Sequence, residues 1–60
     1  MKFRLTIELG NDVMQTGTDV ARVLEKVANF LTSYEALQPD LSNNLRDLNG
    51  NKVGEWKVTR

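Results

Sequence analysis

The chain has 60 residues, of which 40% are hydrophobic and 27% are charged, a size and composition that predict one folded domain, residues 1–60. Eight Lys and Arg residues balance eight Asp and Glu residues. Nucleic-acid binders typically have an excess of basic residues, so this balance argues against nucleic-acid binding. The chain contains neither cysteine nor histidine, which excludes disulfides, thiolate or imidazole metal sites and the familiar nucleophile–base pairs.

Without these groups, stability must come from hydrophobic packing or self-association, and we expect about 3–5 kcal/mol for the monomer. The N-terminal residues alternate polar and apolar types where a secretion signal needs an apolar run, so a cytoplasmic protein is expected. No apolar stretch approaches the roughly 20 residues that cross a bilayer. We therefore expect no cofactor, metal, membrane or small-molecule substrate, while the zero net charge makes a homodimer plausible.

Residues 2–9 alternate polar and apolar types without error, which predicts a strand with one buried face. The face predicted to be buried carries Phe3, Leu5, Ile7 and Leu9. The opposite face carries Lys2, Arg4, Thr6 and Glu8. Residues 10–17 contain several turn-forming types and are predicted as a loop, with Val13 and Met14 turned inward.

A helix is predicted after this loop, because Thr16 and Asp19 have the spacing of a capping box, with Thr18 as the alternative cap. One helical stripe is formed by Val20, Val23, Leu24, Val27, Leu31 and Tyr34. Phe30 lies off this stripe, at its margin or partly exposed. The helix must end before Pro39, and residues 38–44 are predicted as loop.

A β-hairpin is predicted for the C-terminal part, because Asn49 and Gly50 lie between the strand-like runs 45–48 and 52–58. Trp56 and Val58 share one face of the second run, whereas strict alternation puts Val53 on the other. We therefore predict a β-bulge near Gly54 that restores the register.

These elements predict an α+β fold with the chain order β-α-β-β and a three-stranded sheet of order 1-3-2. One helix is expected to cover a single face, the one that carries Phe3, Leu5, Ile7, Leu9, Trp56 and Val58. The other face is expected to stay open, and so are both sheet edges, which favours association.

Two motifs with acidic residues could in principle carry chemistry. Glu8 and Asp12 flank the first loop, but one helix on a small sheet offers no cleft for a catalytic pair, so solvated loop acids are favoured. Asp47, Asn49 and Asn51 have the first three ligand spacings of a calcium loop, yet its required glycine and final acid are missing. Turn chemistry is therefore the favoured interpretation, and no enzyme is expected.

The remaining candidates are partner-binding residues. The open face offers Lys2, Arg4, Thr6 and Lys57, and the helix end offers Phe30 and Tyr34. The favoured function is a non-catalytic interaction protein that self-associates or binds a protein partner through the open face, a sheet edge or these two aromatics. The alternative is a small nucleic-acid-binding regulator that uses Lys2, Arg4, Lys57 and Arg60.

The two ends of the chain also carry a resemblance. Residues 3–12 with Met14-Gln15-Thr16, and residues 46–58, resemble a set of small uncharacterised proteins encoded by actinobacterial phages and their hosts. The resemblance implies no activity and no site residues. It implies a context, in which very small phage proteins often bind and alter a host macromolecule, and so favours an interaction protein over a metabolic one.

Overall fold

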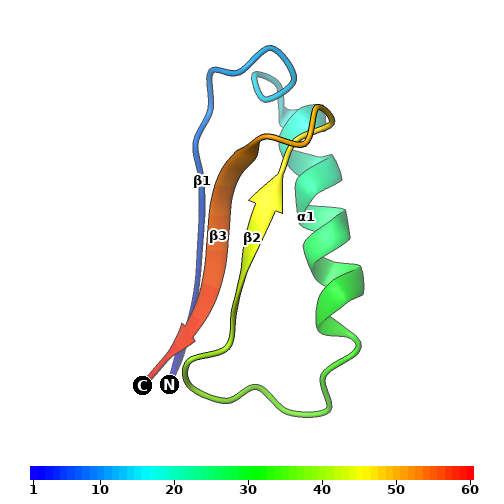
Figure 1. Ribbon diagram of the computed structural model, residues 1–60. Coiled ribbons are helices and arrows are strands. Elements are labelled where there is room, and N and C mark those ends of the chain that lie inside the picture. Colours follow the sequence, from blue (N-terminus) through cyan, green and yellow to red (C-terminus); the bar gives the residue numbers. More distant parts are fainter.

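The computed structural model describes residues 1–60 and contains three strands and one helix (Figure 1). In chain order these are β1 (Lys2–Ile7), α1 (Gly17–Leu31), β2 (Ser42–Arg46) and β3 (Lys52–Thr59). The strands form one antiparallel sheet in the order β1-β3-β2. The predicted α+β class, chain order and central last strand are confirmed.

Strand β1 is shorter than the alternating run that predicted it. It ends at Ile7, and the next backbone N–H, that of Glu8, still donates to the carbonyl of Val53 over 2.7 Å. Gly10 then has φ +120°, a conformation that favours glycine, and the chain turns away from the sheet. Leu9 is left 64% exposed, so its predicted place in the core is wrong.

Helix α1 begins with the predicted capping box. The hydroxyl of Thr16 accepts from the N–H of Asp19, and the Asp19 carboxylate accepts from the N–H of Thr16, each over 3.1 Å. Thr16 is therefore the N-cap, and Thr18 lies inside the helix. These bonds lower the pKa of Asp19, chiefly through the backbone N–H groups of Gln15 and Thr16.

The buried face of α1 is centred on Val23 and Val27, which are the two buried residues of the helix. At 100° per residue, Leu24 lies roughly 80° from that centre, and it is 43% exposed although it was placed in the buried stripe. Phe30 lies only about 40° from the centre, yet it is 44% exposed. Phe30 therefore points toward the sheet at a place where the sheet does not cover it.

Strand β2 lies earlier than predicted. It spans Ser42–Arg46, so residues 42–44 are strand rather than loop, and Leu48 is in the turn. Asn43 and Asn44 have low strand propensity, which hid the strand in the sequence. Pairing with β3 places Asn43 opposite Trp56, and this long-range contact overrides the local preference.

The hairpin loop is organised by one buried carboxylate. Asp47 is 5% exposed, and its Oδ1 accepts from the backbone N–H groups of Asn49 and Asn51, both over 2.9 Å. Burial raises the pKa of Asp47, but these two N–H groups and the side chains of Asn51 and Asn11 outweigh it, so the pKa is lowered. Asp47 thus stabilises the turn by accepting these hydrogen bonds, in agreement with the favoured turn interpretation of this motif.

The predicted bulge is present beside Gly54. The β2–β3 register shifts between Leu45, opposite Gly54, and Arg46, opposite Lys52, and leaves Val53 as the extra residue. The shift turns Val53 into the core, where it is 3% exposed. A Cβ on Gly54 would overlap the carbonyl oxygen of Thr6 in β1, so the close approach of the two backbones requires glycine.

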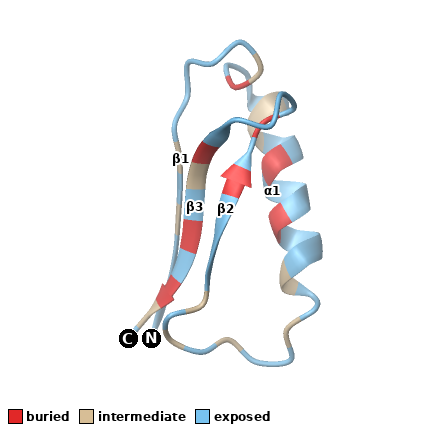
Figure 2. Ribbon diagram, in the orientation of Figure 1, coloured by how far each residue is buried: buried red, intermediate tan, exposed pale blue.

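The core lies between β3, β2, α1 and the first loop, and β1 contributes no buried residue (Figure 2). Trp56 and Met14 are its most buried side chains, each 1% exposed, and Leu5 and Ile7 of β1 are only partly buried. The helix lies beside β2, and β1 is the strand farthest from it (Figure 1). The expected cover over Phe3 is therefore incomplete, and Phe3 stays 42% exposed.

Candidate functional site

All four aromatic residues of the chain form one cluster around Trp56. Phe3 stacks on the indole with ring centroids 5.5 Å apart, and Tyr34 meets it edge-on at 6.2 Å. Phe30 lies 6.4 Å from Trp56 and 5.8 Å from Tyr34. These separations suit aromatic pairs, so the exposed Phe30 ring is held in place by two neighbours.

A groove opens beside this cluster, between α1 and the edge strand β2. Its volume is about 240 Å³. The helix contributes Val23, Lys26, Val27 and Phe30, the strand contributes Asn43, Asn44, Leu45 and Arg46, and Trp56 belongs to β3. Ligand pockets usually measure roughly 300–1,000 Å³, so this α1/β2 groove suits one or two side chains of a protein segment rather than a whole metabolite.

The charged residues of the α1/β2 groove are both cationic. Lys26 comes from the helix and Arg46 from the strand, and neither forms an ion pair. The ion pair of this structure, Arg22 with Asp19 at 3.5 Å, lies on the first turns of α1 and leaves Lys26 free. Arg46 is oriented by a bond from its Nη1 to the carbonyl of Gly50 over 3.0 Å. An occupant that brings a carboxylate would meet both cations.

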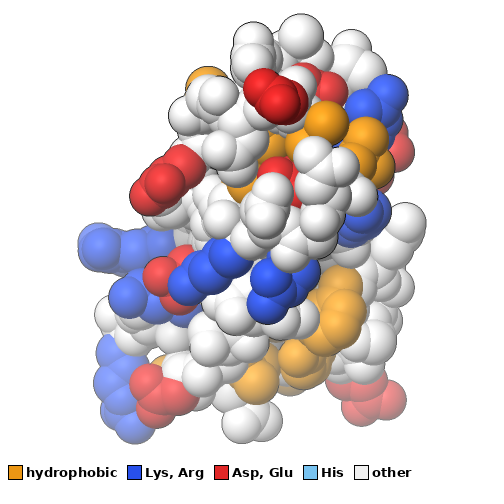
Figure 3. Space-filling model, turned by 45° about the horizontal axis from the view of Figure 1, so that its top comes forward, with side chains coloured by type: hydrophobic (Ala, Val, Ile, Leu, Met, Phe, Trp, Pro, Cys, Tyr) orange, Lys and Arg blue, Asp and Glu red, His pale blue; other side chains and the backbone are white.

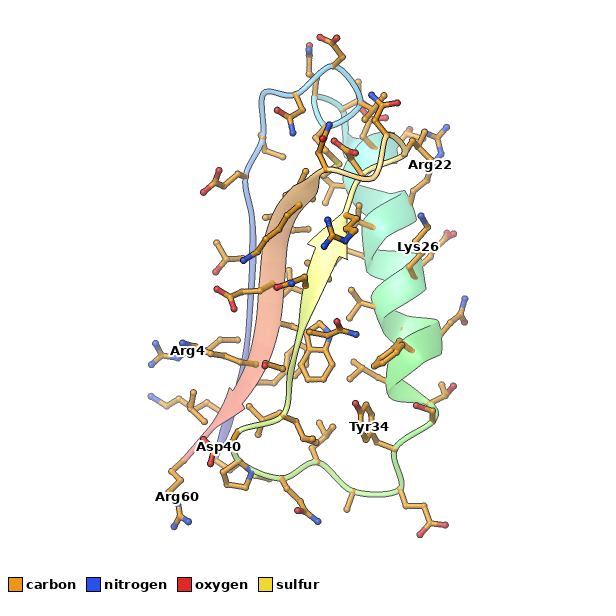
Figure 4. The ribbon with its side chains drawn as sticks, viewed as in Figure 1. Arg4, Arg22, Lys26, Tyr34, Asp40 and Arg60 are labelled. Atoms are coloured by element: carbon orange, nitrogen blue, oxygen red, sulfur yellow. The ribbon has the colours of Figure 1, made fainter.

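The sheet face opposite α1 carries the four polar residues that were predicted there. Arg4 lies directly opposite Lys57, Lys2 opposite Thr59, and Thr6 opposite Glu55. Arg4 projects away from the helix (Figure 4), and Lys and Arg side chains gather on the sheet side of the surface in Figure 3. Like charges directly opposite each other are unfavourable, so a bound anion would stabilise the Arg4–Lys57 pair.

The other candidate residues do not join these groups. Tyr34 is half-buried and points toward the sheet (Figure 4), so it supports the cluster from below and lines no groove. Arg60 directly follows the last residue of β3 and lies away from the helix (Figure 4). Glu8 and Asp12 are both exposed, and no group of three acidic side chains is placed to hold a metal ion.

No family model, curated protein or solved structure matches this chain. No helix reaches the length and apolar character that crossing a membrane requires.

Sequence reasoning selected Phe30 but missed the rest of the α1/β2 groove. Lys26 precedes Phe30 by four residues, so the two share a helix face, and that spacing was a usable signal. The β2 wall had no such signal, because residues 43 and 44 were predicted as loop and Arg46 was not assigned a role.

Proposed function

We propose that this chain is a non-catalytic interaction protein that binds a segment of a partner protein in the α1/β2 groove. The observation that carries the proposal is Phe30, an aromatic ring 44% exposed at an apolar groove and held there by Trp56 and Tyr34. A ring that is already fixed loses little conformational entropy on binding, and aromatic anchors often dominate interface energies.

The chemistry of the groove suggests the kind of segment. Val23, Val27, Leu45 and Trp56 suit an apolar side chain, and Lys26 and Arg46 suit an acidic residue beside it. The groove contains no carboxylate, and the chain has no histidine or cysteine to activate a nucleophile. These features support binding rather than catalysis.

The surface area of the chain supports an interaction role. A folded monomer of 6.8 kDa is expected to expose about 3,950 Å², and this chain exposes 4430 Å². The resemblance of the two ends to small proteins of actinobacterial phages favours a host protein as the partner, and the cytoplasm is the expected setting. Self-association through a separate surface is the second part of the proposed role.

The test is an affinity pull-down with the tagged chain from actinobacterial lysate, with and without nuclease, followed by mass spectrometry. The wild type is compared with Phe30→Ala and Lys26→Glu, and Leu24→Ala is the matched control. Leu24 is 43% exposed on the same helix but lies outside the groove. Circular dichroism confirms that each variant is folded.

We expect a defined protein that is captured by the wild type and by Leu24→Ala, regardless of nuclease, and lost with both groove variants. Lys26→Glu is the sharper variant, because it reverses a charge without removing packed atoms. Equal capture by all four proteins would contradict the α1/β2 groove as the binding site.

A nucleic-acid-binding regulator is the second candidate, and the observation that favours it is Arg4 opposite Lys57 without an acidic partner. Glu55 lies on the same face and reduces the positive potential there. Binding through Lys2, Arg4, Lys57 and Arg60 would weaken steeply with salt and would be lost in Arg4→Gln/Lys57→Gln. If the wild type gives no gel shift with nucleic acid at low salt, this candidate is excluded.

A further inference from the structure

Strand β1 presents an unpaired backbone edge. The bond from the N–H of Glu8 to the carbonyl of Val53 shows which alternate residues of β1 are hydrogen-bonded to β3. In an antiparallel ladder, hydrogen-bonded residues alternate with residues that face outward, so the backbone groups of Phe3, Leu5 and Ile7 point away from β3. β1 is a terminal strand of the sheet, and no other segment of the chain lies alongside its outer edge (Figure 1).

The other edge of the sheet is protected. Helix α1 lies beside β2 (Figure 1), and the side-chain oxygen of Asn43 accepts from the backbone N–H of Asn44 over 2.9 Å. The side chain of Asn43 occupies one outward donor of β2, and a helix beside an edge strand hinders the addition of another strand there. No side chain of the molecule bonds to an outward backbone group of β1. β1 is therefore the edge that is available for pairing.

We propose that β1 pairs antiparallel with β1 of a second copy of this chain, with Leu5 opposite Leu5, so that one sheet continues across both copies. The proposal rests on the interaction role proposed above and names a second copy as one partner. In this register the outward backbone groups of Phe3, Leu5 and Ile7 meet those of Ile7, Leu5 and Phe3 of the second copy.

The side chains agree with this register on both faces. On the helix side, Phe3 meets Ile7 of the second copy, which adds cover to a ring that is 42% exposed. On the open side, Lys2 meets Glu8 of the second copy, and neither residue has an ion-pair partner within its own chain. The zero net charge of the chain also avoids repulsion between copies.

Neighbouring registers are less favourable. Only shifts by an even number of residues keep the outward backbone groups opposite each other. One such shift places Arg4 against Arg4 of the second copy, a like-charge contact. The other places Thr6 opposite Thr6 and leaves Phe3 facing Leu9, which lies beyond the end of β1.

The first test is the dissociation constant of the homodimer, measured by sedimentation equilibrium for wild type, Glu8→Lys, and Lys2→Glu/Glu8→Lys. The single variant replaces attraction by repulsion at both symmetric contacts, so we expect roughly a threefold to tenfold weaker dimer. The double variant restores attraction with the signs exchanged and should regain affinity. All these positions are exposed, so folding is unaffected.

Lys26→Glu is the control that separates the two proposals. It should leave the dimer intact while it abolishes partner capture, because the groove is lined by α1 and β2, and β2 is at the opposite edge of the sheet from β1. A chain that stays monomeric up to about 1 mM, where even a 1 mM complex would be half-formed, overturns the β1 dimer. A dimer that weakens with Lys26→Glu but not with Glu8→Lys also overturns it.

The second test reads the register directly and uses the absence of native cysteine. Single variants Leu5→Cys, Arg4→Cys and Thr6→Cys are oxidised, and the rate of disulfide-linked dimer formation is followed on gels. Directly opposite residues have Cα atoms about 4.5–5.5 Å apart, within the range of a disulfide. Leu5→Cys should cross-link fastest. Faster cross-linking of either neighbour overturns the register, and equal slow rates for all three overturn β1 pairing.

Discussion

Among the glycines of this chain, Gly54 has the least space for a side chain, because backbone atoms of β1 lie where its Cβ would be. We expect Gly54→Ala to lower the free energy of unfolding by about 3 kcal/mol, the upper end for overpacking, and so to remove most of the stability expected for a chain this small. Urea denaturation followed by circular dichroism measures the loss. Gly17→Ala is the control, since no atom lies within 4 Å of the added Cβ.

Two carboxylates make stability depend on acid. The pKa values of Asp19 and Asp47 are both lowered from 3.8 in the folded chain, by backbone N–H groups at the helix N-terminus and in the hairpin loop. A carboxylate whose pKa is lower in the folded chain than in the unfolded chain stabilises the fold at pH values above the unfolded-state pKa. That contribution is lost as the pH falls through 3.8 and below.

Thermal unfolding between pH 7 and pH 2 checks this expectation. The wild type should hold its melting temperature down to about pH 5 and lose it progressively below that. The double variant Asp19→Asn/Asp47→Asn should have a lower melting temperature at pH 7, and its melting temperature should fall less steeply between pH 5 and pH 2. If the melting temperature of the double variant falls as steeply at acidic pH as that of the wild type, other carboxylates control the loss of stability in acid.

At the level of elements, helix α1 depends on its cap. Thr16→Ala removes the acceptor for the N–H of Asp19 and should cost about 1 kcal/mol in the free energy of unfolding. Thr18→Ala is the matched control, because Thr18 lies inside the helix and its side chain bonds to no cap group, so its effect should stay within about 0.5 kcal/mol. Equal losses in both variants would contradict Thr16 as the cap.

The helix and the first strand were predicted from patterns that are local and regular. Strict alternation is visible in β1, and a capping box followed by helical spacing is visible in α1. Strand β2 lacks such a pattern, because Asn43 and Asn44 carry no strand preference. It becomes a strand only because β3 supplies the hydrogen-bonding partner.

For the whole molecule, one side chain connects all the layers. Trp56 is 1% exposed and touches aromatic rings from β1, the last turn of α1 and the segment after it. Trp56→Ala should cost about 3–5 kcal/mol, comparable to the entire stability expected for the monomer, and so should leave the chain unfolded at 25 °C. Amide dispersion in an NMR spectrum checks this, and Leu48→Ala, at a residue 59% exposed, should remain folded.

The shape of the molecule explains why two apolar margins of its surface stay partly exposed. Its extents are 34 × 19 × 18 Å, and the sheet is covered by a single helix that lies toward β2. The apolar side of β1 lies at one margin of the sheet, the ring of Phe30 lies in the groove between α1 and the strand at the other margin, and each remains partly exposed. A longer chain would cover both margins with further elements, whereas this chain leaves both margins partly exposed.

By itself the sequence determined the class of fold, the chain order of the elements and the bulge at Gly54, and it narrowed the helix cap to Thr16 or Thr18. Each of these depends on spacing within a few residues and on chain connectivity, which the sequence contains directly. The tertiary structure decided where β2 begins, where α1 lies over the sheet, and hence that Phe30 borders a groove and that, of the two edges expected to be open, only the β1 edge stays unprotected. Those outcomes depend on the relative placement of segments far apart in the chain, and local periodicity carries no information about it.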